Sequence, residues 1–157
     1  MTMNNNNNNI TKFEEPLWLS PHFTLQEMTD SGTARKLGID NTPSAGVIEN
    51  LQALCEHVLE PVRRRFGRTI ISSGYRCEEL NRRVGGAEGS QHLRGEAADI
   101  YCSSLTEARR RYDFIRQNCD FDQLLLEERL YLGTCWLHVS YVRQPGRRPN
   151  RHDARGF

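Results

Sequence analysis

Apolar residues recur along the chain with a helical period first and a strand period later. From residue 44 to residue 66 they return every three or four positions, which predicts one long helix with a single buried face. Gly67 is expected to end this helix, and Pro61 is expected to kink or interrupt it near its end. Three shorter helices are predicted: one that begins after the capping residue Thr24, one over residues 78–84 and one over residues 105–118.

The strand signals lie mostly in the second half of the chain. Residues 69–73 form a β-branched run, and residues 97–101 read as a further strand. Residues 121–127 and 135–142 look like the two strands of a hairpin. Helices come first and short strands dominate later, so the sequence predicts an α+β fold with a small antiparallel sheet flanked by helices.

The length of 157 residues fits one domain with its own core. Residues 1–19 include a tract of six asparagines from Asn4 to Asn9, and we expect them to be a disordered leader. Residues 20–143 are expected to form the domain. Residues 144–157 are basic and contain proline and glycine, which predicts a flexible tail.

Charge and composition exclude several classes of protein. The formal net charge is +1, so no overall field recruits nucleic acid or an anionic membrane, and neither partner is expected. The arginine clusters at residues 63–65 and 109–111 are stronger local signals, and the second is expected to be a solvated helix face. No apolar run approaches the ~20 residues of a membrane span. We expect a monomer.

The five cysteines form no Cys-x-x-Cys pair and are odd in number, which argues against a disulfide framework. The first residues lack the basic start and apolar stretch of a secretory signal. Both observations predict synthesis in the cytoplasm without a signal peptide.

Two short segments, residues 90–99 and 136–140, carry the candidate chemistry. Alternation along the predicted strands turns Asp99 and His138 away from their apolar neighbours, while His92 arrives from the loop before. Two imidazoles and one carboxylate form a common ligand set for catalytic zinc, whose fourth position is left for water. Taken singly, each residue is more simply a loop histidine, a turn acid or a sheet histidine, but the joint pattern favours a zinc site.

Three blocks of the sequence resemble the zinc D-Ala-D-Ala carboxypeptidases and peptidoglycan endopeptidases (peptidase M15, with the hedgehog/D,D-peptidase fold). They are residues 72–76 with Leu80-Asn81, residues 90–99 and residues 136–140, and the resemblance covers about residues 20–143. It implies a zinc metallopeptidase that hydrolyses peptide bonds in peptidoglycan stem peptides by metal-activated water. It does not separate carboxypeptidase from endopeptidase cleavage.

The resemblance also implies roles for individual residues. His92, Asp99 and His138 would hold the zinc ion, and Arg76 would bind the substrate's carboxylate or stabilise charge on the attacked carbonyl, as its planar charged fork allows. The remaining implied substrate-binding or substrate-positioning residues are Ser90, Gln91 and Trp136. A surface role for Arg76 and a core role for Trp136 are the alternatives.

The general base is harder to place, because several relatives carry an acid three residues before the second histidine and this chain has Cys135 there. In the branch that the chain most resembles, the acid instead ends the preceding strand, which implies Glu127. Period-2 geometry puts Glu127 and Glu128 on opposite faces, so only one of them can face the zinc.

If neither glutamate reaches the metal, the alternative is a catalytically inactive, zinc-containing module that binds peptide or cell wall. A peptidoglycan substrate lies outside the cytoplasm, and the sequence leaves the site of action open between release to the cell wall, association with a phage and wall recycling inside the cell.

Overall fold

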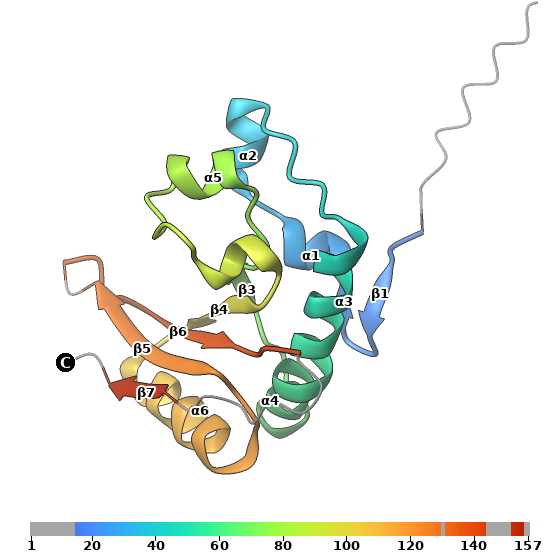
Figure 1. Ribbon diagram of the computed structural model, residues 1–157. Coiled ribbons are helices and arrows are strands. Elements are labelled where there is room, and N and C mark those ends of the chain that lie inside the picture. The colour runs from blue at the N-terminus through green and yellow to red at the C-terminus, as the bar shows by residue number, and fades with distance from the viewer. Residues whose placement is uncertain (1–14, 130, 144–151, 156–157) are drawn as a thin grey trace, which may run out of the picture.

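The computed structural model describes residues 15–129, 131–143 and 152–155 (Figure 1). The helices are α1 (Leu25–Thr29), α2 (Gly32–Leu37), α3 (Ala45–Leu54), a π-helical turn (Cys55–Leu59), α4 (Glu60–Phe66), α5 (Glu78–Arg83), a 3₁₀ helix (Gln91–Arg94) and α6 (Leu105–Asn118). The strands are β1 (Trp18–Ser20), β2 (Phe23–Thr24), β3 (Ile71–Ser73), β4 (Ala97–Cys102), β5 (Gln123–Arg129), β6 (Thr134–Ser140) and β7 (His152–Arg155).

Five strands form the main sheet in the order β3-β4-β6-β5-β7, and β1 and β2 form a separate pair. All pairings in the main sheet are antiparallel except that of β7, which runs parallel to β5. The expected α+β class with a small, largely antiparallel sheet is confirmed. β7 falls within residues 144–157, where the sequence gives no strand signal and a flexible tail was expected; the rest of that segment lies outside the described residues.

The predicted long helix is continuous from residue 45 to residue 66, but it changes its winding before Pro61. The N–H of Glu60 donates to the carbonyl of Cys55, five residues back, instead of four as in an α-helix. Proline lacks an N–H and its ring crowds the carbonyl four residues earlier, so a wider turn accommodates it. The expected interruption at Pro61 therefore takes the form of a π-helical turn.

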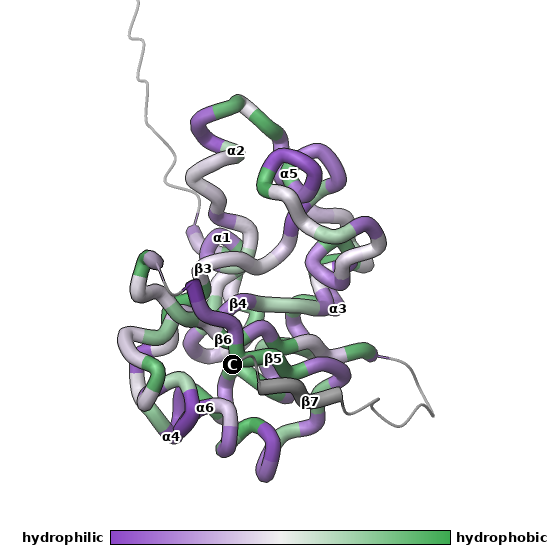
Figure 2. Tube along the Cα trace, turned by 90° about the vertical axis from the view of Figure 1, so that its left-hand side faces the viewer, coloured by the Kyte–Doolittle hydropathy of each residue, from purple (hydrophilic) through white to green (hydrophobic). Residues whose placement is uncertain are grey.

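The hydrophobic core lies between one face of the sheet and α6, with the helix formed by α3 and α4 beside it (Figure 1). Leu124, Leu126, Leu137 and Val139 alternate along β5 and β6 and are fully or almost fully buried. Hydrophobic stretches gather around β5, whereas α5 is largely hydrophilic (Figure 2). Alternation leaves the other sheet face free to carry polar side chains.

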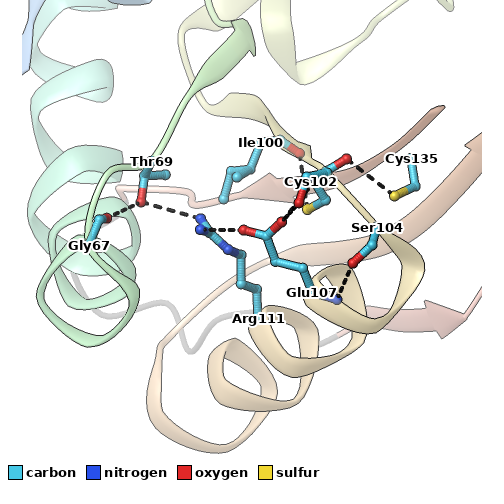
Figure 3. A network of polar contacts seen from close by, with 9 residues as sticks. Gly67, Thr69, Ile100, Cys102, Ser104, Glu107, Arg111 and Cys135 are labelled. Atoms are coloured by element: carbon cyan, nitrogen blue, oxygen red, sulfur yellow. Dashed lines mark hydrogen bonds and ion pairs between the residues drawn. The ribbon is translucent and has the colours of Figure 1, made fainter.

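The buried face of α6 holds one charged residue that the sequence analysis placed wrongly. Arg111 was expected on a solvated face, but it is 5% exposed. Its guanidinium pairs with Glu107 at 2.7 Å and lies 3.4 Å from the hydroxyl of Thr69 (Figure 3). The charge is tolerated there because an acid one helical turn away neutralises it.

The first described residues also belong to the fold. Trp18 and Leu19 were assigned to the leader, yet both lie in β1, and Leu19 is buried in the core. Thr24 caps α1 by accepting a hydrogen bond from the N–H of Glu27, as predicted. No helix among the described residues is long and apolar enough to cross a membrane.

Candidate metal centre and active-site cleft

Three potential ligand atoms meet on the polar face of the sheet. Asp99 on β4 lies directly opposite His138 on β6, and His92 comes from the 3₁₀ helix. Asp99 Oδ1 is 3.0 Å from His138 Nδ1 and 3.4 Å from His92 Nε2. The three ligand atoms all lie within 4.8 Å of one another. Asp99 and His138 were expected on one sheet face, with His92 arriving from the loop before, and the structure brings the three together.

The backbone of the loop that follows β3 orients the side chain of His92. Its Nδ1 lies 2.7 Å from the carbonyl oxygen of Gly74, so Nδ1 carries the proton and donates it. Nε2 is left with a lone pair that faces Asp99. Gly74 has no room for a side chain, because a Cβ would lie 2.2 Å from the carbonyl oxygen of Met28. The tautomer of His92 therefore depends on a close backbone approach.

The carboxylate of Asp99 is held in its charged form. Burial alone would raise its pKa, but the hydrogen bond from His138 and the contact with His92, together with the charge of these imidazoles when they are protonated, outweigh burial and hold the pKa well below its usual range. A deprotonated carboxylate and an imidazole with a free lone pair are the forms that bind a metal ion.

The donor set fits zinc. Two imidazole nitrogens and one carboxylate oxygen are hard-to-borderline ligands that zinc takes in catalytic sites, and three protein ligands leave a coordination position open. The hydrogen bond from His92 to a backbone carbonyl is the kind of support that metal-binding histidines have. Among the described residues, His92, Asp99 and His138 form the group of histidine, cysteine or acidic side chains whose ligand atoms are close enough together to hold one ion.

Arg76 enters the same cleft from the loop between β3 and α5, and its N–H donates to the carbonyl of His92. Its Nε is buried and has no hydrogen-bond partner in the described structure. Burial lowers the pKa of the guanidinium, and the charge of Asp99 opposes this shift. A buried cationic donor without a partner is costly, and a substrate carboxylate would satisfy it.

Two residues that the sequence analysis did not assign to the site fix the position of Arg76. The amide of Asn41 donates to the carbonyl of Tyr75 at 3.0 Å, and its oxygen accepts the N–H of Cys77 at 2.8 Å, so it clamps both neighbours of Arg76. Gly86 lies against the side chain, because a Cβ there would be 2.8 Å from Arg76 Nη1. Neither contact has a local sequence signal.

Glu127 lies on the cleft face of β5, and Glu128 is exposed on the other face. In the hairpin register, Glu127 lies opposite Trp136, and Leu125 lies opposite His138. The Glu127 side chain is thus a diagonal neighbour of His138, a relation that places Cα atoms ~7–8 Å apart. Cys135 points into the core on the opposite face and cannot substitute for an acid here.

The cleft has a volume of about 790 Å³, and all of the expected site residues line it. The hydroxyl of Ser90 accepts the N–H of His92 and caps the 3₁₀ helix, so it supports a candidate ligand. The amide of Gln91 donates to Asp122 at 2.9 Å and is 3.4 Å from Glu96, so its nitrogen is already engaged by two carboxylates. Trp136 forms part of the wall.

Comparison with known proteins agrees with this geometry. The family model described as Peptidase M15 matches residues 21–139, which is well over half of the chain and contains all of the cleft residues named above. A search of curated proteins finds no match.

Proposed function

This chain belongs to the peptidase M15 family, and from that premise we propose that it is a zinc-dependent metallopeptidase that hydrolyses peptide bonds in peptidoglycan stem peptides. The observation that carries the proposal is the convergence of three ligand atoms from His92, Asp99 and His138 in one cleft with Arg76 and Glu127. Peptidoglycan lies outside the cytoplasm, so we propose that the protein acts there.

Each polar residue of the cleft has a distinct task in this proposal. When bound, zinc would supply Lewis-acid chemistry, polarising the scissile carbonyl and lowering the pKa of a water molecule. The Glu127 carboxylate takes the proton from the attacking water and passes it to the leaving nitrogen. Arg76 pairs with a substrate carboxylate through its planar fork and orients the peptide. Trp136 shields one side of the cleft from water.

The experiment combines zinc content with digestion of purified peptidoglycan. Elemental analysis of the purified chain is expected to give about one zinc per chain, and His92→Ala should lose it. Released peptides, identified by mass spectrometry, report which bond is cleaved. Glu127→Gln should retain the metal and lose roughly 100- to 10,000-fold in rate, the range for removal of a general base.

Glu128→Gln is the matched control, because the same change is made one residue away on the opposite face of β5. It should leave both metal and rate unchanged. A chain without zinc after metal supplementation would overturn the metal centre. A zinc-loaded chain that binds but never cleaves peptidoglycan would identify a binding module, and full activity in Glu127→Gln would refute the role of Glu127.

A further inference from the structure

We infer that Arg129 binds a second carboxylate of the substrate, so that the cleft selects peptides with acidic groups on both sides of the scissile bond. The inference rests on the proposed function, since it concerns the specificity of the same cleft. Arg129 is the last residue of β5 and lines the cleft together with Glu127 and Trp136.

The strand register fixes where Arg129 lies relative to the candidate metal ligands. Arg129 is opposite Thr134, which precedes His138 by four residues on β6. At ~3.3 Å per residue, the Arg129 backbone is about 13 Å along the sheet from His138. Arg129 and Glu127 are two residues apart and therefore point to the same face.

The side chain of Arg129 turns back over the cleft wall. Its guanidinium carbon lies 5.5 Å from the centre of the Trp136 ring, and Trp136 is two residues nearer to His138. The aromatic face orients the planar guanidinium and leaves its edge donors available. Within residues 15–129 and 131–143, the structure describes no ion pair for this exposed side chain.

Arg76 and Arg129 flank the candidate metal ligands from opposite ends of the cleft. β3 pairs antiparallel with β4 and places Ser73 opposite Asp99, so the chain that continues to Arg76 moves toward the beginning of β4. Arg129 lies near the other end of β4. Arg129 is opposite Thr134 on β6, and the next residue of β6, Cys135, is opposite Cys102, the last residue of β4. A peptide lying along the strands meets one guanidinium on each side of the ligands.

The spacing defines the class of substrate. The Arg129 guanidinium lies along β6 between the positions of Trp136 and Thr134, ~7–13 Å from His138. An extended peptide covers this distance with about two to four residues. The cleft is therefore suited to a peptide that presents one carboxylate to Arg76 and another, two to four residues across the scissile bond, to Arg129. Acidic stem peptides have this chemistry, whereas neutral peptides do not.

The test compares Arg129→Gln with the wild-type chain on two stem peptides that differ in one group. One peptide carries a free carboxylate on the residue two to four positions from the cleaved bond, and its twin carries the carboxamide. Charge-assisted hydrogen bonds predict that Arg129→Gln lowers kcat/KM for the acidic peptide by roughly tenfold to a hundredfold, mainly through KM. The amidated twin should change less than about twofold, and Arg129→Lys should retain part of the preference.

Arg64→Gln is the matched control, since Arg64 is an exposed arginine of α4 outside the cleft. Calorimetric titration of the metal-stripped chain with both peptides measures recognition without turnover. An equal loss on both peptides, or no loss on either, would overturn the inference and reduce Arg129 to a stabiliser of the hairpin. If no peptide is cleaved, the proposed function fails while the calorimetric comparison still decides the role of Arg129.

Discussion

Two histidine–carboxylate clusters lie in the described part of the chain, and they differ in whether their polar atoms can still bind a ligand. In the first, Asp99 Oδ1 faces His92 Nε2 and His138 Nδ1 on the floor of the cleft. In the second, Glu60 is buried beneath the turn between β1 and β2. Its Oε1 accepts hydrogen bonds from the hydroxyl of Ser20 at 2.7 Å and from the N–H of His22 at 2.8 Å, and its Oε2 is 2.8 Å from His22 Nδ1.

The cluster around Asp99 can bind a ligand, whereas the cluster around Glu60 has a structural role. Both oxygens of Glu60 are occupied by donors from the same turn, so the cluster is closed and ties that turn to the long helix. The ligand atoms of the first cluster converge within 4.8 Å of one another beside a large cleft. Residue type alone does not distinguish the two clusters, whereas the gathering of three ligand atoms beside an accessible cleft does.

The cluster of His92, Asp99 and His138 is called the open cluster here, in contrast to the closed cluster around Glu60. The largest expected effect comes from removing the negative charge of Asp99 from the open cluster. We expect Asp99→Asn to reduce the metal content from about one ion per chain to a small fraction, because an amide oxygen is a far weaker ligand for zinc than a carboxylate. Peptide hydrolysis should fall by roughly a thousandfold or more. Elemental analysis and a peptide-release assay measure the two effects.

The metal-free form of this variant supplies the control. Without a metal, Asp99→Asn should unfold in urea within about 1–2 kcal/mol of the wild-type chain, since the amide oxygen still accepts from His138. A larger loss of stability would mean that the open cluster is also a structural fastener, and the contrast with Glu60 would collapse.

The converse change is Glu60→Ala, which removes the acceptor of the closed cluster. It leaves the Ser20 hydroxyl and the His22 N–H without their partner, and the free energy of unfolding should fall by about 3 kcal/mol. Urea titration measures this loss. The zinc content at 25 °C should stay at the wild-type level, and loss of metal from the folded variant would contradict the separation of the two clusters.

Residues 90–99 and 136–140 allowed the open cluster to be predicted, because alternation along a strand decides which side chains share a face. Asp99 and His138 could be placed on the cleft side from their apolar neighbours, whereas alternation left Glu127 and Glu128 open and the family resemblance implied Glu127. The closed cluster escaped prediction. His22 has the pattern of a turn histidine and Glu60 that of a solvated helix acid, and their contact joins residues that are 38 positions apart.

The same limit explains why the supports of Arg76 and the position of Arg129 were missed. The contacts of Asn41 with Tyr75 and Cys77 depend on how two loops pack, and the close approach at Gly86 depends on a backbone path. The contact of Arg129 with Trp136 depends on a side-chain rotamer. Periodicity gives the face on which a residue lies, and tertiary packing gives its partner.

A smaller effect should come from disturbing Arg76 while leaving the metal ligands intact. In Gly86→Ala, the added Cβ would meet Asn81 Oδ1 at 2.0 Å and Arg76 Nη1 at 2.8 Å, so the loop or the guanidinium must shift. We expect kcat/KM to fall about tenfold, as misplacement of a substrate-orienting group does. Metal content should be unchanged. Gly89→Ala is the control. Gly89 lines the same cleft and an added Cβ would meet no atom there, but its φ is +71°, so the variant tests the effect of loop strain alone.

The smallest effect concerns the acid response of the closed cluster. Burial alone would raise the pKa of Glu60, but hydrogen bonds from Ser20 and His22 outweigh it and lower the pKa below its ordinary value of 4.5. A carboxyl group with a lowered pKa in the folded state stabilises the protein above its unfolded pKa, and this stabilisation is lost as the pH falls through the folded pKa. Glu60→Gln cannot titrate.

The difference in unfolding free energy between the wild-type chain and Glu60→Gln should therefore shrink by about 1 kcal/mol between pH 6 and pH 3. Urea titrations of the metal-stripped proteins measure it, and the contribution of Asp99 cancels because both chains contain it. A difference that stays constant with pH would mean that folding leaves the pKa of Glu60 unchanged, and a difference that grows toward pH 3 would mean that Glu60 is protonated in the folded protein.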